Sequence, residues 1–311
     1  MAINKRKLRV TELDFDNIKD NLKTFLKAQQ EFKDYDFEGS GMSVLLDTLA
    51  YNTHYLGFNA NMLANEMFLD SAALRSSVVS HAKTLGYEVS SPRAPIATVN
   101  ISLSTTASTK TMPAGTAFTT TVDGTSYQFV TVSDITSNST GSSIPFDSVN
   151  IYEGSYVTTK YTVDTSDVDQ RFLLSDARSD TTTLKVKVQN SASDSTTTTY
   201  TKATDITQLS ASSTVYFIQE TDSGLFEIYF GDGKVSTALS DGNIVILQYV
   251  VTNKTASNGA TVFGSPSSID GVTGVTTTTV TNATGGSESE SIQSIKLNAP
   301  LDYAAQGRCV T

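Results

Sequence analysis

Apolar residues recur at helical spacing along the first part of the chain. The longest such segment follows Gly39 and Gly41, and its apolar positions are Met42, Leu45, Leu46, Leu49, Leu56, Leu63 and Met67. Residues three or four positions apart lie on one face of an α-helix, so this pattern predicts a long helix. After a break at residues 69–71, a shorter helix is predicted, with Ser71 as its N-cap and Gly86 as a left-handed C-cap. Its apolar stripe comprises Leu74, Val78, Ala82 and Leu85.

An earlier helix is predicted to begin at Asp14 or Asp16, since either side chain can cap it. Its apolar stripe comprises Ile18, Leu22, Phe25, Leu26 and Phe32, and its polar side carries Lys19, Lys23 and Lys27. So short a helix is not stable alone in water, so its stripe must pack on the long helix or on helices of other chains. The preceding basic residues form either a solvated tail or an arm that docks on an acidic partner. They are Lys5, Arg6, Lys7 and Arg9.

The long helix also carries a second, polar and aromatic set of residues. They are Tyr51, Asn52, His54, Tyr55, Asn59, Asn61, Asn65 and Glu66. Asparagine is a poor helix former because its side chain competes for backbone hydrogen bonds, and a solvent-facing helix normally uses Lys, Glu and Gln instead. Amides and aromatic rings suit a protein interface better than water, so this face predicts a partner chain. The alternative is an internal packing surface within one folded domain.

From Ala97 onward, the period of the apolar positions changes from helical to two. Alternation at residues 97–103 predicts a half-buried strand, and turn signals follow at residues 112–115 and 122–124. Further strands are expected near residues 149–152, 156–163, 171–174, 184–188, 200, 215–218, 226–230 and 244–251. Residues 133–145 are expected to be a surface loop, and residues 191–199 a hairpin tip or exposed loop. The predicted fold class is α+β, an N-terminal helical region followed by antiparallel β-sandwich-like domains.

The strand at residues 226–230 leads into a glycine-rich turn made of Gly231, Asp232 and Gly233. Glycine accepts the positive φ that tight turns require, so these three residues are interpreted as a structural turn. Alternation predicts inward side chains at Phe226, Ile228 and Phe230, with Glu227 and Tyr229 outward. A bound cation at Asp232 is the alternative, although one carboxylate does not make a calcium site.

Length and composition narrow the classes of protein. A chain of 311 residues exceeds the usual size of a single core, so two or three domains are expected, and 38% hydrophobic residues support folded domains. The net charge of −10 argues against a general nucleic-acid binder. Cys309 is the single cysteine and cannot form an internal disulfide. The N-terminal residues MAINKRKLRV lack the apolar segment of a signal peptide, and asparagines interrupt the long helix, which argues against a membrane span.

Catalytic and metal-binding motifs are missing from the sequence. Of the two histidines, His81 is interpreted as a packing or surface residue, and His54 as one of the polar residues of the long helix. There is no nucleophile elbow, no phosphate-binding loop, no HExxH and no cysteine pair. The acidic run at residues 164–169 lacks the glycine and the final glutamate of an EF-hand loop and is interpreted as solvated. We therefore expect no enzymatic activity, no cofactor and no metal.

One long string in the helical part is unusual in composition: EGSGMSVLLDTLAYNTHYLGFNANMLANEMFLDSAALRSSVVSHAKTLGYEVSSPRAP. It resembles the N-terminal signature of baseplate wedge proteins of contractile-tailed phages, within the wider baseplate J-like group. The resemblance is close over residues 15–97. Shorter strings resemble later motifs of the same group; they are PAGTAF, FGDG, SNGA and GGSESES with the following IKLNAPLDYAAQGRCVT. This pattern implies that the sequence is the N-terminal portion of a longer protein.

The resemblance implies a structural subunit of the virion tail baseplate, assembled in the host cytoplasm. Its N-terminal helices would tie wedge proteins together in a bundle shared by two copies and another wedge protein. Later domains would contribute to the inner baseplate ring, which changes state to trigger sheath contraction. No contact with nucleic acid or membrane is implied for this portion. The alternative is a β-rich adhesin or receptor-binding tail protein, which the Ser/Thr-rich strands alone permit but which has no need of an amide-rich helix.

Four regions are expected: 1–96 as a helical wedge-assembly region, 97–148 as a first β section, 149–284 as a β-sandwich-like domain and 285–311 as a helical junction to a further domain. In the last, Glu288 and Glu290 precede a helix that Pro300 is expected to end. The suspected partner-interface residues are Leu22, Phe25, Leu26, Leu45, Leu49, Tyr51, His54, Tyr55, Asn59 and Met62.

Overall fold

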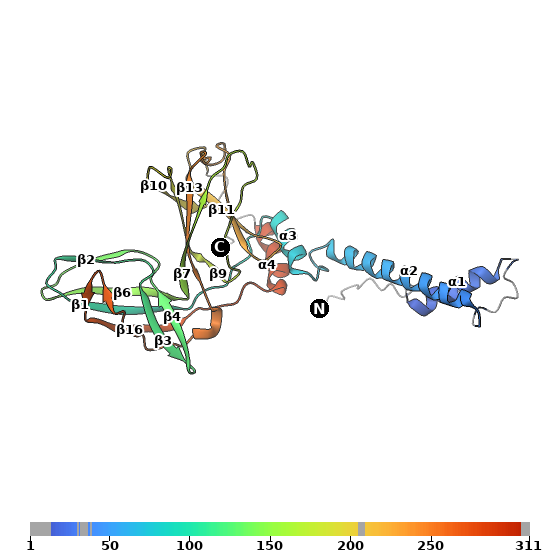
Figure 1. The fold of residues 1–311 in the computed structure, drawn as a ribbon, viewed down its shortest axis with the longest axis horizontal. Helices are drawn as coiled ribbons and strands as arrows, with labels where there is room; N and C mark the ends of the chain where they lie inside the picture. The colour runs from blue at the N-terminus through green and yellow to red at the C-terminus, as the bar shows by residue number, and fades with distance from the viewer. Residues whose placement is uncertain (1–13, 30, 32–36, 38, 205–208, 306–311) are drawn as a thin grey trace. The chain divides into compact units, whose positions relative to one another are not determined.

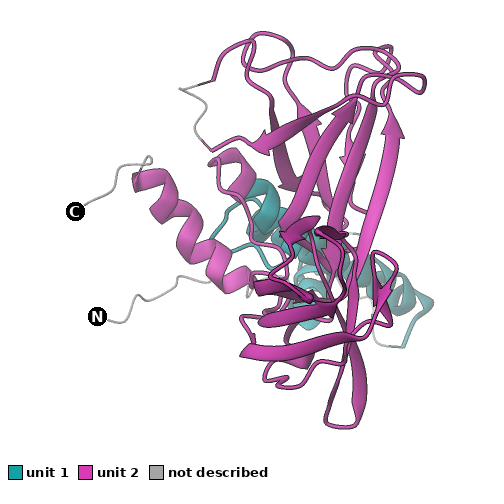
Figure 2. Cartoon of the chain, turned by 90° about the vertical axis from the view of Figure 1, so that its left-hand side faces the viewer, with its two compact units in different colours: residues 1–81 teal, residues 82–311 magenta. Residues whose placement is uncertain are grey.

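The computed structural model describes residues 14–29, 31, 37, 39–204 and 209–305. The chain divides into two compact units, residues 1–81 and 82–311 (Figures 1 and 2). The basic residues at positions 5–9, together with Phe32 and Cys309, lie outside the described residues. None of the described helices is both long enough and apolar enough to cross a membrane.

The first unit contains the two N-terminal helices that the apolar spacing predicts. Helix α1 spans Phe15–Lys27, and the Asp14 carboxylate caps it by accepting a hydrogen bond from the Phe15 amide at 3.0 Å. Helix α2 spans Gly41–Glu66. The two helices pack together, with Ile18, Leu46 and Ala50 buried and an ion pair of 2.5 Å between Lys19 and Asp47. Only one side of α2 is used in this contact.

The next helix, α3, spans Arg75–Thr84 and begins later than expected. Ser71 is not its N-cap, because the Ser71 hydroxyl donates back to the Asn65 carbonyl at 2.6 Å. The Glu66 carboxylate instead accepts from the amides of Ala73 and Leu74, at 2.7 and 3.3 Å. These amides would otherwise lack partners at the start of the helix. The expected glycine C-cap is confirmed by the positive φ of Gly86, which is +80°.

A five-stranded antiparallel sheet in the second unit forms what we call the carrier domain (Figure 1). Its strand order is β16-β1-β6-β4-β3, with β16 at Val275–Thr284, β1 at Ile96–Ser104, β6 at Ser143–Glu153, β4 at Thr125–Val130 and β3 at Ala117–Val122. The β3–β4 hairpin turns at Asp123 and Gly124, both with positive φ, which confirms the predicted hairpin. Phe118, Phe129 and Ile151 lie in its core.

A separate two-stranded antiparallel sheet lies beside this sheet. Strand β2 (Thr109–Met112) pairs with β5 (Ile135–Asn138), which lies in the segment predicted to be a loop. That prediction is wrong for residues 135–138, and also for residues 143–145, which begin β6. Short polar strands carry little periodic signal, and β5 forms because Ile135 pairs with Met112 and packs against the carrier core.

The second sheet, which we call the inserted domain, has seven strands and its own core. Its order is β7-β13-β9-β10-β11-β12-β8. The strands are β7 at Ser155–Thr162, β8 at Phe172–Leu173, β9 at Ser179–Gln189, β10 at Thr197–Lys202, β11 at Val215–Glu220, β12 at Phe226–Phe230 and β13 at Ile244–Val251. All pairs are antiparallel except β10 with β11. Because Gln189 lies opposite Thr197, the β9–β10 pairing confirms a hairpin tip at residues 191–196, while residues 197–199 of the predicted segment belong to β10.

The order of the strands along the chain shows that one β domain is inserted into the other. The chain leaves the carrier sheet after β6, builds the whole inserted domain, and returns through the 3-10 helix η4 (Lys254–Ser257), β14 (Ser268–Ile269) and β15 (Val272–Thr273) to β16. The expected division between residues 148 and 149 therefore falls within β6. Strand β16 was not predicted; its residues fall in the expected second section, but it pairs with β1 of the first. Periodicity defines a strand but does not identify its partner.

The last described helix, α4, spans Ile292–Ala305. Ser291 caps it by accepting from the Ser294 amide at 3.2 Å. Pro300 lies inside the helix, so the expectation that it ends the helix is wrong. Proline removes one backbone hydrogen bond, but its fixed φ of about −65° is compatible with a helix, and α4 continues beyond Pro300 to Ala305. Its buried residues, Ile295 and Ala299, both lie before the proline.

The glycine-rich turn follows β12. Phe226 and Ile228 are buried in the core of the inserted domain, and Phe230 packs against that core, while Glu227 and Tyr229 are only partly buried. Gly233 has φ +84° and its amide donates to the Ser236 carbonyl at 2.9 Å. A Cβ at Gly231 would overlap the hydroxyl of the fully buried Ser236 and would lie 2.9 Å from the backbone carbonyl of the same residue.

We expect Gly233→Val and Gly231→Ala each to lower the melting temperature of the β region. The first places a β-branched side chain at positive φ, at a cost of about 1–3 kcal/mol, and the second creates a steric clash. Differential scanning calorimetry measures both. Gly41→Ala is the matched control, because its Cβ meets no atom within 4 Å, and it should melt like the wild type. Wild-type melting of both turn variants would contradict the structural role of this turn.

Candidate assembly surface

Most large apolar side chains of α2 are exposed within the described structure. Nine of them are 45–68% exposed: Val44, Leu45, Leu49, Tyr51, Tyr55, Leu56, Phe58, Met62 and Leu63. Fully burying one such side chain is worth roughly 1.5–3 kcal/mol. A continuous patch of this kind marks an interaction site on a soluble protein.

These side chains follow a heptad pattern. Leu45, Leu49, Asn52, Leu56, Asn59 and Leu63 are separated alternately by four and three residues, and we call them the first seam. This spacing is that of the contact positions of a coiled coil. All six residues are exposed. The first seam therefore has the sequence of a coiled-coil contact without a partner helix among the described residues of its unit.

A second seam runs beside the first with the same alternation. Its members are Val44, Thr48, Tyr51, Tyr55, Phe58 and Met62. The rings of Tyr51 and Tyr55 lie against each other, with centroids 5.2 Å apart. Successive heptad seams on one helix face different neighbours, so two seams fit a bundle in which α2 contacts two further helices.

The structure brings together most of the suspected interface residues. Leu45, Leu49, Tyr51, Tyr55, Asn59 and Met62 all lie on the two seams. His54 does not, because it is seven residues from Asp47 and so shares the helix face that carries the Lys19–Asp47 ion pair. On α1, Phe25 is 65% exposed, whereas Leu22 and Leu26 are half-buried.

Four exposed apolar residues of the seams were missed among the suspected interface positions. They are Val44, Leu56, Phe58 and Leu63. The signal that identifies them is the alternating four-three spacing, which is visible in the sequence once two seams are sought. The turn residues Gly231, Asp232 and Gly233 lie in the inserted domain and contribute to its fold rather than to this surface.

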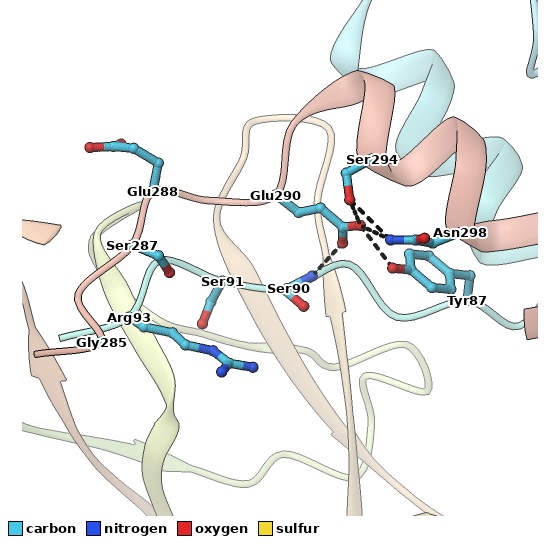
Figure 3. Close-up of a pocket in the computed structure, with 10 residues that line it drawn as sticks. All are labelled: Tyr87, Ser90, Ser91, Arg93, Gly285, Ser287, Glu288, Glu290, Ser294 and Asn298. Carbon is cyan, nitrogen blue, oxygen red and sulfur yellow. Dashed lines mark hydrogen bonds between the residues drawn. The ribbon is translucent and has the colours of Figure 1, made fainter. Parts of the chain in front are cut away.

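A polar pocket of about 380 Å³ lies within the second unit, between the segment after α3 and the start of α4 (Figure 3). Glu290 is its centre, and the side chains of Tyr87, Ser294 and Asn298 point toward it. Its carboxylate accepts from the Tyr87 hydroxyl at 2.8 Å, the Ser294 hydroxyl at 2.7 Å and the Ser90 amide at 3.1 Å. Glu290 therefore ties residues 87–90 to α4.

These contacts set the charge state of the pocket. Burial raises the pKa of Glu290, but the hydrogen bonds from Ser294, Ser90, Tyr87 and Asn298 outweigh it and hold the pKa below its ordinary value. Burial, followed by the hydrogen bond to Glu290, raises the pKa of Tyr87 to about 12. A carboxylate held ionised by several donors is a poor general acid, so the arrangement favours a structural anchor over catalysis.

A second contact holds the glycine pair that precedes α4. The Asn258 side chain donates to the Gly286 carbonyl and accepts from the Gly286 amide, both at 3.0 Å. A Cβ at Gly286 would lie 2.5 Å from the Lys254 carbonyl and from Pro95. Two of the short strings noted in the sequence, SNGA and GGSESES, therefore meet in space. Among the described residues, no group of three His, Cys, Asp or Glu side chains is placed to hold a metal ion.

Two parts of this chain match known protein families. Residues 14–87 match the helical domain of gp6-like baseplate wedge proteins, and residues 157–274 match the third domain of bacteriophage baseplate wedge protein gp6. Both seams lie in the first match. Baseplate wedge protein gp6 of Enterobacteria phage T4 is 30% identical over 326 residues, covering 96% of this chain. The chain spans 48% of the length of that relative.

This chain is also similar to a chain in a solved structure, the cryo-EM structure of the anti-feeding prophage (AFP) baseplate, 6-fold symmetrised. The alignment covers 95% of this chain and 61% of the other chain. The sequence identity is 12% and the TM-score 0.35, which is too low to support an argument about the fold.

Replacing a central residue of the first seam tests whether the surface is buried in association. We expect Leu49→Asp to shift the full chain to monomers in sedimentation velocity, because burying an unpaired carboxylate costs several kcal/mol. Asn21→Asp adds the same charge at an exposed position of α1 and should associate like the wild type. A wild-type chain that stays monomeric, folded and free of partners would sink the interpretation.

The lowered pKa of Glu290 predicts that its contribution to the stability of the folded chain depends on pH. Glu290 has a lowered pKa, so its stabilising effect is present above its ordinary pKa of 4.5 and is lost as the pH falls through the folded value. We expect Glu290→Gln to lower the melting temperature at neutral pH, and this difference should shrink below pH 4.5. Glu31→Gln, at an exposed position, gives the baseline. A difference that stays constant between neutral and acidic pH would mean that the charge of Glu290 contributes nothing.

Proposed function

Since this chain belongs to the gp6-like baseplate wedge proteins, we propose that its helices join the subunits of a contractile-tail wedge and that its β region belongs to the inner baseplate ring. The chain is a structural subunit located in the virion tail baseplate. The single observation that carries the proposed role of the helices is the pair of exposed heptad seams on α2.

The two seams specify the kind of partner. A seam of leucines interrupted by Asn52 and Asn59 is best completed by a helix that places amides at the same levels, since a buried asparagine needs another polar group opposite it. A second copy of this chain, aligned in parallel and in register, meets this requirement without further adjustment. The aromatic second seam would then take a helix from a different wedge protein. This arrangement is a bundle shared by two copies and one further subunit.

The β region would give the wedge its fixed geometry. On host contact the inner ring changes state and sheath contraction follows, and such a change requires interfaces with two well-packed arrangements. We propose that the chain acts through these interfaces alone, without enzymatic activity, metal or cofactor, and without binding nucleic acid or membrane. The saturated hydrogen bonding of Glu290 supports this view for the described pocket.

Two finer assignments belong with this proposal. Membership of the wider baseplate J-like group is supported by the FGDG, SNGA and GGSESES strings, and the sequence as the N-terminal portion of a longer protein stays a prediction. We propose residues 1–96 as the assembly region. In place of the division at residue 148, we propose a carrier domain interrupted by an inserted domain. The gp6 matches favour the wedge role over the adhesin alternative.

Disulfide trapping tests the second copy as a partner. In a Cys309→Ser background, Asn59→Cys should give a disulfide-linked dimer on mild oxidation, because in-register seams bring equivalent residues face to face. Asn21→Cys, on the exposed side of α1, should remain monomeric under the same conditions. The readout is non-reducing electrophoresis. If both variants cross-link equally, or neither does, the first seam does not face a second copy.

A further inference from the structure

The inserted domain is joined to the carrier domain by two neighbouring connections. One is Gly154, between β6 and β7, and the other is the segment that leaves β13 at Thr252 and Asn253. Gly154 has φ +122°, and a Cβ there would overlap the Val251 carbonyl, so the two connections nearly touch. Glycine is required for this approach. The seven strands of the inserted domain are therefore attached to the carrier domain at one place, where its two chain connections lie side by side. We call this place the crossing.

A buried carboxylate lies at this crossing. Glu153, the last residue of β6, is completely buried. It accepts hydrogen bonds from the Thr252 hydroxyl at 2.7 Å, the Asn253 amide at 2.8 Å and the Asn253 side-chain nitrogen at 2.7 Å. All three donors come from two consecutive residues of the other connection. The carboxylate of one connection therefore grips the second.

The hydrogen-bond network around Glu153 extends further into the inserted domain. The Asn253 side-chain oxygen accepts from Arg178 at 3.4 Å, and Arg178 forms an ion pair of 2.9 Å with Asp176. The apolar part of the same junction centres on Ala94, Val130 and Val250, with Ala117, Val132, Tyr152 and Tyr156 packed against them. Polar and apolar contacts therefore both join the two domains.

Physical chemistry distinguishes such a contact from ordinary packing. Apolar residues of similar size would often stabilise a junction as well or better, because burying a charge has a large desolvation cost. A buried carboxylate differs in being satisfied in one geometry only. If the second connection shifts, all three hydrogen bonds are lost together and the carboxylate needs water. The contact is consequently either closed or open.

We propose that Glu153 is a latch that fixes the inserted domain against the carrier domain, and that opening it lets the inserted domain turn about Gly154. The inference rests on the fold alone and does not require the proposed function. Other hydrogen bonds also join the two domains: the Asp180 carboxylate accepts from the Ala94 amide at 2.8 Å, the Gly154 amide donates to the Gln128 carbonyl at 2.8 Å, and Lys185 donates to the Ser133 hydroxyl. None of these contacts involves Thr252 or Asn253, the residues that Glu153 holds.

Distances between spin labels on the two domains test the latch in the full chain. In a Cys309→Ser background, labels at Ser126→Cys on β4 and Thr198→Cys on β10 use exposed positions of the two sheets. Pulsed electron–electron double resonance should give one narrow peak in the distance distribution between the two labels when Glu153 is intact. Glu153→Gln should broaden or split this peak, because its amide nitrogen faces donors instead of accepting from them. Glu227→Gln, on the outer side of β12, makes the same chemical change and should leave the peak unchanged.

The outcomes separate the latch from general instability. If Glu153→Gln fails to fold by circular dichroism, Thr252→Val decides, since it removes one donor while preserving shape; broadening in this folded variant supports the latch. A narrow peak that is unchanged in folded Glu153→Gln, or in Thr252→Val when Glu153→Gln does not fold, overturns the proposal. So does a broad distribution in the wild type, because the latch would then hold nothing.

Discussion

Helix α2 carries more apolar surface than its own unit covers, and the proposed role of the helical region depends on this surface. Helix α1 buries the side with Leu46 and Ala50, while both heptad seams remain exposed. Water disfavours such a surface, and isolated helices gain most of their stability from packing. The described part of the helical unit therefore leaves a large apolar surface on α2 uncovered. We propose that association with other chains covers this surface, which fits its interface-like composition along most of the helix.

The second unit follows the opposite rule, since its interactions are largely satisfied internally. Three polar contacts connect segments that are far apart in the sequence: Glu153 with Asn253, Asn258 with Gly286, and Glu290 with Ser90. Buried polar groups of this kind specify one geometry more than they add stability. A wedge subunit needs both properties, a surface that other chains complete and a β region whose parts keep fixed orientations.

Local patterns in the sequence were sufficient to predict the helices, most strands and the hairpin at Asp123 and Gly124. They failed where the deciding contact is distant. Ser71 has the chemistry of a cap, but Glu66 reaches the same amides from the preceding helix. Pro300 is a helix breaker by propensity, yet α4 continues past it to Ala305, and Ile295 and Ala299 in the preceding part of the helix are buried by tertiary contacts. The return of β16 to β1 depends on pairing across about 180 residues, which no local periodicity records.

The candidate surface was predictable in part for the same reason. Leu49, Tyr55 and Met62 stood out because apolar and aromatic residues on a helix leave a periodic trace. Leu56 and Leu63 were assigned to the apolar stripe of the helix but not to its interface, since spacing does not reveal that α1 covers only one side. Glu153 gave no signal at all, because a glutamate at the end of a strand is ordinary until its donors are known.

A cryo-EM reconstruction of the assembled baseplate tests the central claim most directly. The account predicts that the first seam of α2, from Leu45 to Leu63, packs against a helix of another chain, and that the second seam contacts a further helix. Side-chain density for both contacts would be visible at ordinary resolution for such particles. Seams that face solvent, or that are covered by the β region of the same chain, would contradict it.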